Sequence, residues 1–207
     1  MATTDISGVQ ARTIPDVDDH NQGMYRTIAF VKAIVEHAKQ DPSLNGDKIG
    51  VLGASLGGIL SVFAMSIVPD ISVGFFAVAG GDLPSILANS NQKKVRQIRG
   101  YRMSKLGMTA AGEYERYLRS QLLYDPLDFA GQIPTESVRM VISRKDRKVP
   151  TVNQWQLHKA LGGPEVEVSR WGHTWTIISS LGPKDATNDI ADFFVRRFQE
   201  KNPRAFR

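Results

Sequence analysis

The spacing of apolar residues changes along the chain, and the alternation between two spacings predicts the fold. Between residues 22 and 40 the apolar side chains follow a helical repeat, at Met24, Ile28, Val31, Val35 and Ala38. Four short, continuous apolar runs come later, of the kind found in strands that are buried on both faces. They are residues 48–52, 71–79, 138–143 and 166–170. Helical stretches lie between and after them, at 57–68, 150–161 and 183–199. The chain is therefore predicted to be α/β, a mostly parallel sheet covered by helices on both faces.

One long helical stretch interrupts this alternation. It covers about residues 83–123, is more polar than its surroundings and ends at Tyr124-Asp125-Pro126. We expect a helical cap, inserted at about 83–131, that covers a site. Residues 1–20 are polar and include Pro15, so we expect an irregular N-terminal arm, which leaves 21–207 as one main domain.

The first predicted strand leads directly into Gly53-Ala54-Ser55-Leu56-Gly57-Gly58, a G-x-S-x-G pentad with one further glycine. A strand, a sharp turn and a helix in this order form a nucleophile elbow, which strains the serine backbone and exposes its Oγ. The glycines are expected where side chains would collide as strand and helix close on each other. The alternative is a glycine-rich turn with a bystander serine, so a base and an acid must decide between the two.

A serine hydroxyl needs a base, which is usually a histidine held by a carboxylate. His20 lies in the polar arm, and His37 and His158 lie within predicted helices. His173 follows the last predicted strand, on what we expect to be a loop at its carboxyl end. This position favours His173 as the base, with a capping or buried polar histidine as the alternative.

The carboxylate is expected between the serine and the histidine in the sequence, just after a strand. Asp146 follows the run 138–143 and precedes Val149-Pro150, which opens a helix. It could instead pair with its basic neighbours or cap that helix. The rival acid is Asp82, which follows the preceding strand but comes directly before Leu83-Pro84 and could be an N-cap. We favour Asp146.

The motifs GASLGG around Ser55, KDRKVP around Asp146 and WGHTW around His173 resemble the α/β-hydrolase superfamily. The segment YDPLDFA at 124–130 is similar to esterase, dienelactone-hydrolase-like and prolyl-oligopeptidase-like members, and the resemblance covers about residues 22–200. It implies Ser55 as nucleophile, His173 as general base and then acid, and Asp146 as its orienter. It also implies the Leu56 backbone N–H as an oxyanion donor. The implied activity is hydrolysis of a small-molecule carboxylic ester through an acyl-enzyme, with peptides as the alternative substrate. No metal or organic cofactor is expected.

The chain departs from this family before Ser55. In the family the nucleophile strand is the fifth of about eight, whereas here only one helix and the polar arm precede it, and no His-Gly pair occurs there. We therefore expect the elbow strand to lie at a sheet edge that needs covering. A homo-oligomer or a separate N-terminal partner chain would cover it, or the arm of residues 1–20 would partly cover it instead. The alternative function is a catalytically impaired hydrolase-like fragment or subunit that needs a partner, or that serves as a structural or binding protein.

Composition and charge limit the chemistry, the partners and the compartment that we expect for the chain. The 207 residues carry a formal net charge of +5 and include no cysteine, which excludes disulfides and thiolate chemistry. Basic residues cluster at 93–102 and 144–148, but Tyr101 is the single aromatic residue among them, so we expect no nucleic-acid partner and interpret the first cluster as a solvated helix face. Attraction of anionic substrates is a lesser alternative.

No apolar run approaches the length of a membrane span, and residues 1–10 lack a signal-peptide pattern. The cytoplasm is therefore the default expectation, and the sequence leaves the compartment open.

Overall fold

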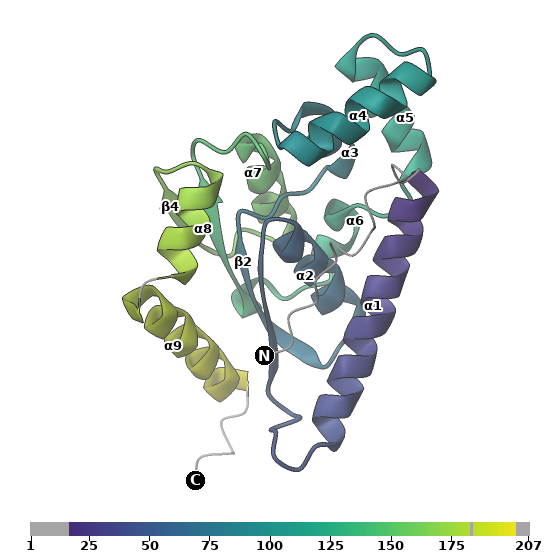
Figure 1. The fold of residues 1–207 in the computed structure, drawn as a ribbon. Coiled ribbons are helices and arrows are strands. Elements are labelled where there is room, and N and C mark those ends of the chain that lie inside the picture. The colour runs from purple at the N-terminus through teal and green to yellow at the C-terminus, as the bar shows by residue number, and fades with distance from the viewer. Residues whose placement is uncertain (1–16, 183, 202–207) are drawn as a thin grey trace.

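A single parallel sheet organises the chain. The computed structural model describes residues 17–182 and 184–201. The strands are β1 (Ile49–Ala54), β2 (Ile71–Ala77), β3 (Val138–Ser143) and β4 (Glu165–Ser169), and they pair in chain order, all in parallel. In Figure 1 helices lie on both sides of this sheet. The predicted fold class, an α/β parallel sheet covered on both faces, is confirmed.

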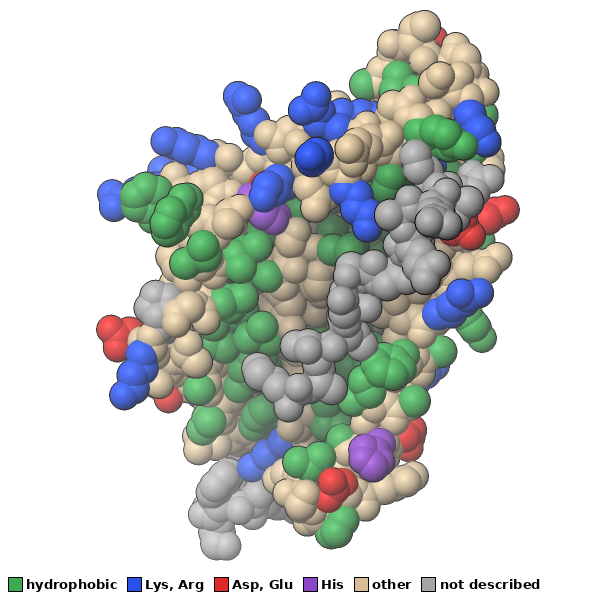
Figure 2. Space-filling view, in the orientation of Figure 1, with side chains coloured by type: hydrophobic (Ala, Val, Ile, Leu, Met, Phe, Trp, Pro, Cys, Tyr) green, Lys and Arg blue, Asp and Glu red, His purple; other side chains and the backbone are tan. Residues whose placement is uncertain are grey.

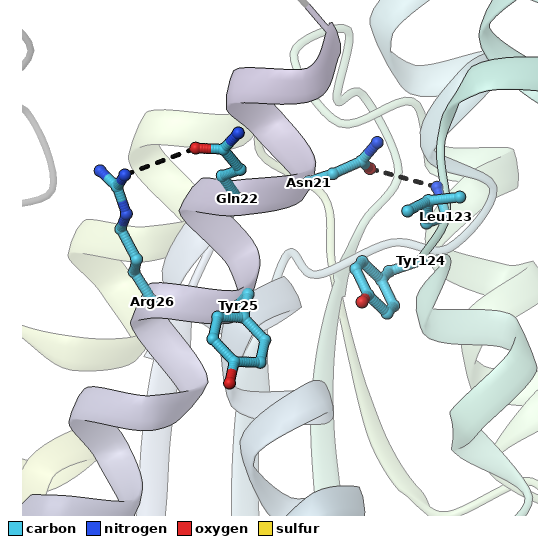
Figure 3. Close-up of a pocket in the computed structure, with 6 residues that line it drawn as sticks. All are labelled: Asn21, Gln22, Tyr25, Arg26, Leu123 and Tyr124. Atoms are coloured by element: carbon cyan, nitrogen blue, oxygen red, sulfur yellow. Dashed lines mark hydrogen bonds between the residues drawn. The ribbon is translucent and has the colours of Figure 1, made fainter.

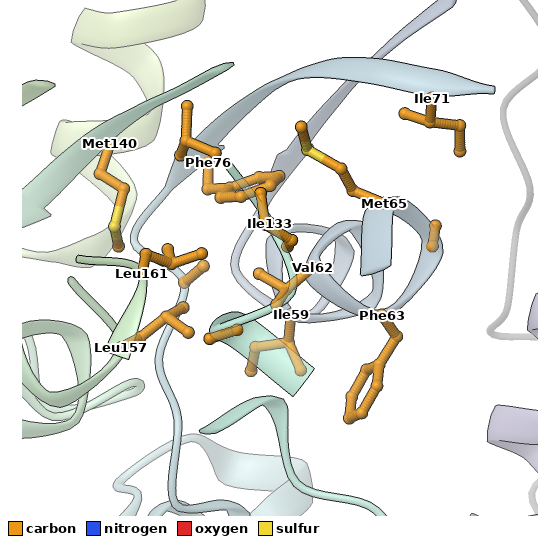
Figure 4. Packing of buried hydrophobic residues seen from close by; sticks show 14 of the residues in the cluster. Ile59, Val62, Phe63, Met65, Ile71, Phe76, Ile133, Met140, Leu157 and Leu161 are labelled. Atoms are coloured by element: carbon orange, nitrogen blue, oxygen red, sulfur yellow. The ribbon is translucent and has the colours of Figure 1, made fainter. Parts of the chain in front are cut away.

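Alternate residues of the central strands supply two separate cores, as the two-residue period of a strand requires. On one face Phe76 and Met140 pack with α2 (Leu56–Ile67) and with Leu157 of α7 (Thr151–Ala160), in the cluster that Figure 4 shows. On the other face Phe75 and Val141 pack against Phe193 of α9 (Lys184–Lys201). Both faces of β2 and β3 are therefore dry, which explains their continuous apolar runs.

The structure differs from the expected arm at its end. Residues 1–16 lie outside the described residues, but 17–20 form the first turn of α1 (Val17–Gln40) and are not irregular. Asp18 and Asp19 favour a helix start there because negative charge stabilises the N-terminal end of a helix. Val17 is buried against Tyr114 and Leu118, and this contact anchors the turn.

The structure also differs from the prediction at His173. We expected this residue on a loop, but it begins helix α8 (His173–Leu181).

None of the described helices combines the length and the apolar composition that a membrane crossing requires.

The polar stretch after β2 forms several helices where the sequence predicted one. They are α3 (Leu83–Asn89), α4 (Lys93–Lys105) and α5 (Ala111–Gln121), followed by the short α6 (Pro126–Ala130) and the 3₁₀ turn Thr135–Ser137. The Asp125 carboxylate ties the two ends of the stretch, because it accepts hydrogen bonds from the backbone N–H groups of Asp82 and Leu83. Helix α6 lies on the main body, where the rings of Phe129 and Phe63 meet at 5.4 Å.

In the part of the chain that the structure describes, the side next to β1 is uncovered. Within the described residues β1 pairs with β2 alone, so it is an edge strand. Leu52 on β1 is 42% exposed and Leu56 at the start of α2 is 55% exposed. Figure 2 shows hydrophobic side chains gathering on this side, between α1 and the pair α8 and α9. An apolar sheet edge of this kind favours association with another polypeptide.

The turn between β1 and α2 needs only two of its three glycines. A Cβ on Gly53 would collide with the Gly57 carbonyl oxygen and with Ser61, and a Cβ on Gly58 would lie 2.8 Å from the Cβ of Ala79. A Cβ on Gly57 would meet nothing within 4 Å. The expected collision is therefore confirmed at Gly53 and Gly58 and wrong at Gly57, which faces the open side next to Leu56.

A pair of substitutions in this helical turn tests the packing. Gly58→Ala should lower the free energy of unfolding by about 1–3 kcal/mol, because the new methyl overpacks against Ala79. Gly57→Ala, one residue earlier, should leave it unchanged or raise it by up to about 1 kcal/mol, because alanine restricts the unfolded chain and favours the helix. Urea denaturation of the two variants measures the difference, and equal destabilisation would contradict this account of the turn.

Candidate active site

The candidate residues all follow strands, at the edge of the sheet where parallel strands end. Ser55 follows β1 directly, Asp146 comes three residues after β3, and His173 comes four residues after β4. Sites of open parallel sheets lie at this carboxyl edge. The topology therefore places at one edge of the sheet three positions that are up to 118 residues apart in sequence (173 − 55).

Ser55 has the strained backbone that the sequence predicts. Its φ of 55° and ψ of −124° lie outside the regions that non-glycine residues favour. The strain is held from both sides, because the Ser55 N–H donates to Ala77 O at 2.9 Å and its carbonyl accepts from Ile59 N at 3.0 Å. The Ser55 side chain does not cap α2, so its Oγ is not used by the helix that follows.

A second strained residue lies beside Ser55 and was not predicted. Val78, which follows β2, is fully buried and has a φ of 47°, which is rare for a β-branched residue. Its N–H donates to Val141 O at 2.8 Å, while the carbonyl of the preceding Ala77 accepts from Ser55. The peptide between Ala77 and Val78 thus links the Ser55 turn to β3. No sequence signal marked Val78, because valine is an ordinary strand residue.

Asp146 and His173 are in direct contact. Asp146 Oδ2 lies 2.6 Å from His173 Nδ1, and the Asp146 side chain is fully buried. The two residues of the turn after Asp146 also hold it, since Oδ1 accepts from Lys148 N at 2.8 Å and Val149 N at 3.1 Å. All these partners of the carboxylate are donors when Nδ1 carries its proton. This arrangement suits an ionised Asp146 and leaves the Nε2 lone pair of His173 as the acceptor.

Gln154 completes the support of Asp146 and was missed by the sequence analysis. This fully buried α7 residue donates from Nε2 to Asp146 Oδ2 at 2.9 Å and to Val149 O at 2.8 Å. Its Oε1 accepts from Ser143 N at 2.9 Å, and this contact fixes which way the amide points. Its position three residues before Leu157, on the buried face of α7, is a signal that could have identified it.

The loop before His173 is held as firmly. Ser143 Oγ donates to Trp171 O at 2.6 Å, which joins the end of β3 to the residue two before His173. Gly172 is the N-cap of α8, so His173 lies at the first position of a helix rather than on a loop. The helix contacts β3 and α9, and Leu181 at its end packs with the core on that face of the sheet, whereas Trp175 and Ile178 are exposed.

The rival acid has other partners. Asp82 is the N-cap of α3, where it accepts from Ser85 N at 3.2 Å, and it pairs with Arg119 at 3.0 Å. Hydrogen bonds to Asp82 and Glu115 raise the pKa of Arg119 above its usual value. Within the described residues Asp82 makes no hydrogen bond to His173.

The other histidines also have positions of their own. His20 contacts Arg102, His158 contacts Pro164 O, and His37 is exposed on α1.

One link of the expected arrangement is not formed within the described residues, because Ser55 Oγ makes no hydrogen bond to His173 there. The Leu56 N–H, at the start of α2, has no backbone partner outside the helix in that part of the chain. In that same part of the chain no three His, Asp or Glu side chains gather as a metal site would require.

The first basic cluster is not simply a solvated helix face. Arg99 turns inward and donates to the carbonyls of Leu87, Ala88 and Ser90 at the end of α3. Arg102 is only 6% exposed and donates to the Tyr114 hydroxyl at 3.2 Å. These two arginines hold the helices of the inserted segment together, whereas Lys93, Lys94 and Arg96 are exposed.

The surface has two hollows of interest. One, of about 520 Å³, is lined by Asn91, Lys93, Arg96 and Gln97 at the start of α4. The other, of about 360 Å³, lies between α1 and the segment after α5, where Asn21 accepts from Leu123 N (Figure 3). None of the candidate site residues lines either hollow.

Comparison with known proteins gives likenesses of structure alone. No protein-family model matches the sequence, and no curated protein matches it. An acetyl xylan esterase from a Thermoanaerobacterium species superposes with a TM-score of 0.64 at 18% identity, over 94% of this chain and 62% of that one. An esterase of Pyrococcus furiosus gives a TM-score of 0.55 at 19% identity, over 91% of this chain and 65% of that one. An alpha/beta hydrolase from a Penicillium species gives 0.57 at 15% identity, over 84% and 72%.

The chain thus spans a little under two thirds of the length of the two esterases. Its four parallel strands, its helices on both faces and these likenesses show that the chain has the α/β-hydrolase fold.

Proposed function

We propose that the chain is a serine hydrolase that cleaves carboxylic esters through an acyl-enzyme intermediate. The observation that carries this proposal is the 2.6 Å contact between His173 Nδ1 and the buried Asp146, at the same sheet edge as the strained Ser55. A buried acid that orients a histidine toward a serine is the arrangement that activates a hydroxyl. Small-molecule esters are the proposed substrates, with peptides as the alternative.

In this mechanism His173 Nε2 removes the proton of Ser55 Oγ as the oxygen attacks the carbonyl carbon of the ester. Asp146 accepts from Nδ1–H, which keeps the ring in the required tautomer and stabilises its positive charge. The tetrahedral intermediate collapses, its alcohol leaves, and His173 returns the proton to that alcohol. A water molecule then attacks the acyl-enzyme by the same steps, which releases the acid and restores Ser55.

The Leu56 N–H is the proposed donor to the oxyanion. It begins α2, whose N-terminal end favours negative charge, and the Ser55 side chain does not compete for the first turn. An oxyanion hole normally has at least two donors, and loss of one costs about 10²–10³ in rate. The second donor is proposed to come from another polypeptide segment on the open side of β1.

The open side of β1 favours a second candidate function. Exposed Leu52 and Leu56 flank Ser55, so the chain could work only with a partner chain or as a second copy, or could be a structural or binding subunit without catalysis. The support of Asp146 by Gln154 weighs against the second candidate, because a binding subunit has no need of an oriented histidine.

A fluorophosphonate probe tests the nucleophile and the base. Wild type should be labelled, Ser55→Ala should not, and His173→Ala should slow labelling by on the order of 10³–10⁴, because the hydroxyl loses its base. Gel fluorescence against time measures the rates. Ser61→Ala and His158→Ala are matched controls that should label as wild type does. A folded wild type that stays unlabelled would refute catalysis by this chain alone and support the second candidate.

Two isosteric variants test the acid. Asp146→Asn should lower kcat for 4-nitrophenyl acetate by on the order of 10⁴, because the amide cannot accept from Nδ1–H while keeping its other donors. Asp82→Asn should change kcat less than about tenfold, since it weakens the Arg119 pair and the cap of α3. The opposite ranking would assign the role to Asp82.

The open edge predicts that the purified chain associates with itself. Light scattering should give at least twice the monomer mass, and Leu52→Lys should restore the monomer because a charge on an edge strand opposes pairing. Leu106→Lys, at an equally exposed leucine after α4, is the control and should not change the mass. A wild type that is monomeric at all concentrations contradicts self-association.

A further inference from the structure

The two basic segments lie close together, although about 40 residues separate them in sequence. Asn91 N donates to Arg147 O at 2.8 Å, and Ser90 Oγ donates to Lys148 O at 2.6 Å. The linker just before α4 therefore rests on the turn that carries Asp146. Sequence reasoning treated the segments separately, and the proposed mechanism uses none of their cations.

The hollow of about 520 Å³ opens at this junction. Its lining consists of two cations, Lys93 and Arg96, and two amides, Asn91 and Gln97. The lining includes no carboxylate. All four side chains can donate hydrogen bonds, and the cations add positive charge, so the chemistry of the lining suits an anion.

Neither the two cations that line the hollow nor those of the neighbouring turn at 144–148 pair with an acidic side chain of the described residues. Within the described residues no ion pair is formed by Lys93, Arg96, Arg144, Lys145, Arg147 or Lys148. Elsewhere in the molecule Arg119 and Arg139 each contact at least two carboxylates. The acid of the turn itself, Asp146, is buried against His173. The side chains that line the hollow and those of the neighbouring turn therefore carry a positive charge that no carboxylate neutralises through an ion pair.

This charge extends to the proposed catalytic pair. Lys148 Nζ donates to Thr174 Oγ1 at 3.0 Å, which places a cation beside the residue after His173. Burial lowers the pKa of Arg99 below its usual value, and the nearby charge of Arg96 lowers it further, which agrees with a positive potential at α4. Figure 2 shows Lys and Arg side chains gathering along the end of the molecule that carries α4, α7 and α8.

We propose that this hollow binds an anionic group, a carboxylate or a phosphate, on the substrate whose ester bond is cleaved at Ser55. The inference rests on the proposed function and names its substrate class. A small anionic substrate fits better than a nucleic acid, because the lining is concave and contains no aromatic side chain for base stacking. Several exposed cations around a hollow raise the local concentration of an anion, and added salt screens this attraction.

Two esters of similar size test the proposal, 4-nitrophenyl hydrogen glutarate and the neutral 4-nitrophenyl valerate. At low salt the anionic ester should have a kcat/KM about tenfold higher, and the ratio should fall towards one at about 0.5 M salt as screening increases. The double variant Lys93→Gln/Arg96→Gln should bring the ratio near one without changing the neutral ester. Lys32→Gln/Lys159→Gln removes the same charge elsewhere and should keep the preference. Inhibition by glutarate compared with inorganic phosphate tells which anion is preferred.

Equal kcat/KM values for the two esters, or a preference that survives Lys93→Gln/Arg96→Gln, would overturn the inference. A separate measurement keeps it distinct from the proposed function. Saturation-transfer NMR of monoethyl glutarate with Ser55→Ala protein should show binding that the double variant loses. Binding without hydrolysis of either ester would refute the hydrolase and uphold the anion site, whereas absence of binding would overturn the site itself.

Discussion

The buried carboxylate of Asp146 is the group on which most of the site's geometry depends. A carboxylate without exposure is unfavourable unless donors surround it. Here two donors come from its own turn, one from Gln154 on α7 and one from His173 at the start of α8. Meeting this one requirement therefore fixes the turn after β3, the position of α7 and the orientation of the histidine. The position of His173, the proposed base, therefore depends on hydrogen bonds made by buried residues.

The nucleophile side of the site is less well supported. Ser55 follows an edge strand, and the leucines beside it are half exposed, whereas Asp146 follows a strand with neighbours on both sides. The strain at Ser55 is maintained by its hydrogen bonds to Ala77 and Ile59 and by the strained Val78 next to it. Asp146 and His173 are held by several hydrogen bonds, whereas Ser55 lies at an edge strand beside exposed leucines. This contrast supports both a catalytic function and a dependence of that function on another polypeptide.

The sequence predicted what depends on period and chain order. Apolar runs located all four strands to within about two residues, and parallel order placed Asp146 and His173 at one edge, where the structure brings them into contact. The helix at 173–181 was not predicted, because Gly172 has no side chain to cap it and the apolar run of the helix is short. Gln154 and Val78 were not predicted, because their roles depend on residues that are close only in the folded chain. The basic composition of α4 concealed the burial of Arg99 and Arg102, which depends on where α3 and α5 pack.

The central claim is that Ser55 carries the acyl group between two chemical steps. Rapid acid quenching after mixing with excess 4-nitrophenyl acetate, followed by tandem mass spectrometry, tests this claim most directly. The account predicts a protein about 42 Da heavier, with the acetyl group on Ser55 in the wild type and absent when His173 is replaced by alanine. An acetyl group found only on a lysine or a histidine, or hydrolysis without any adduct, would contradict it.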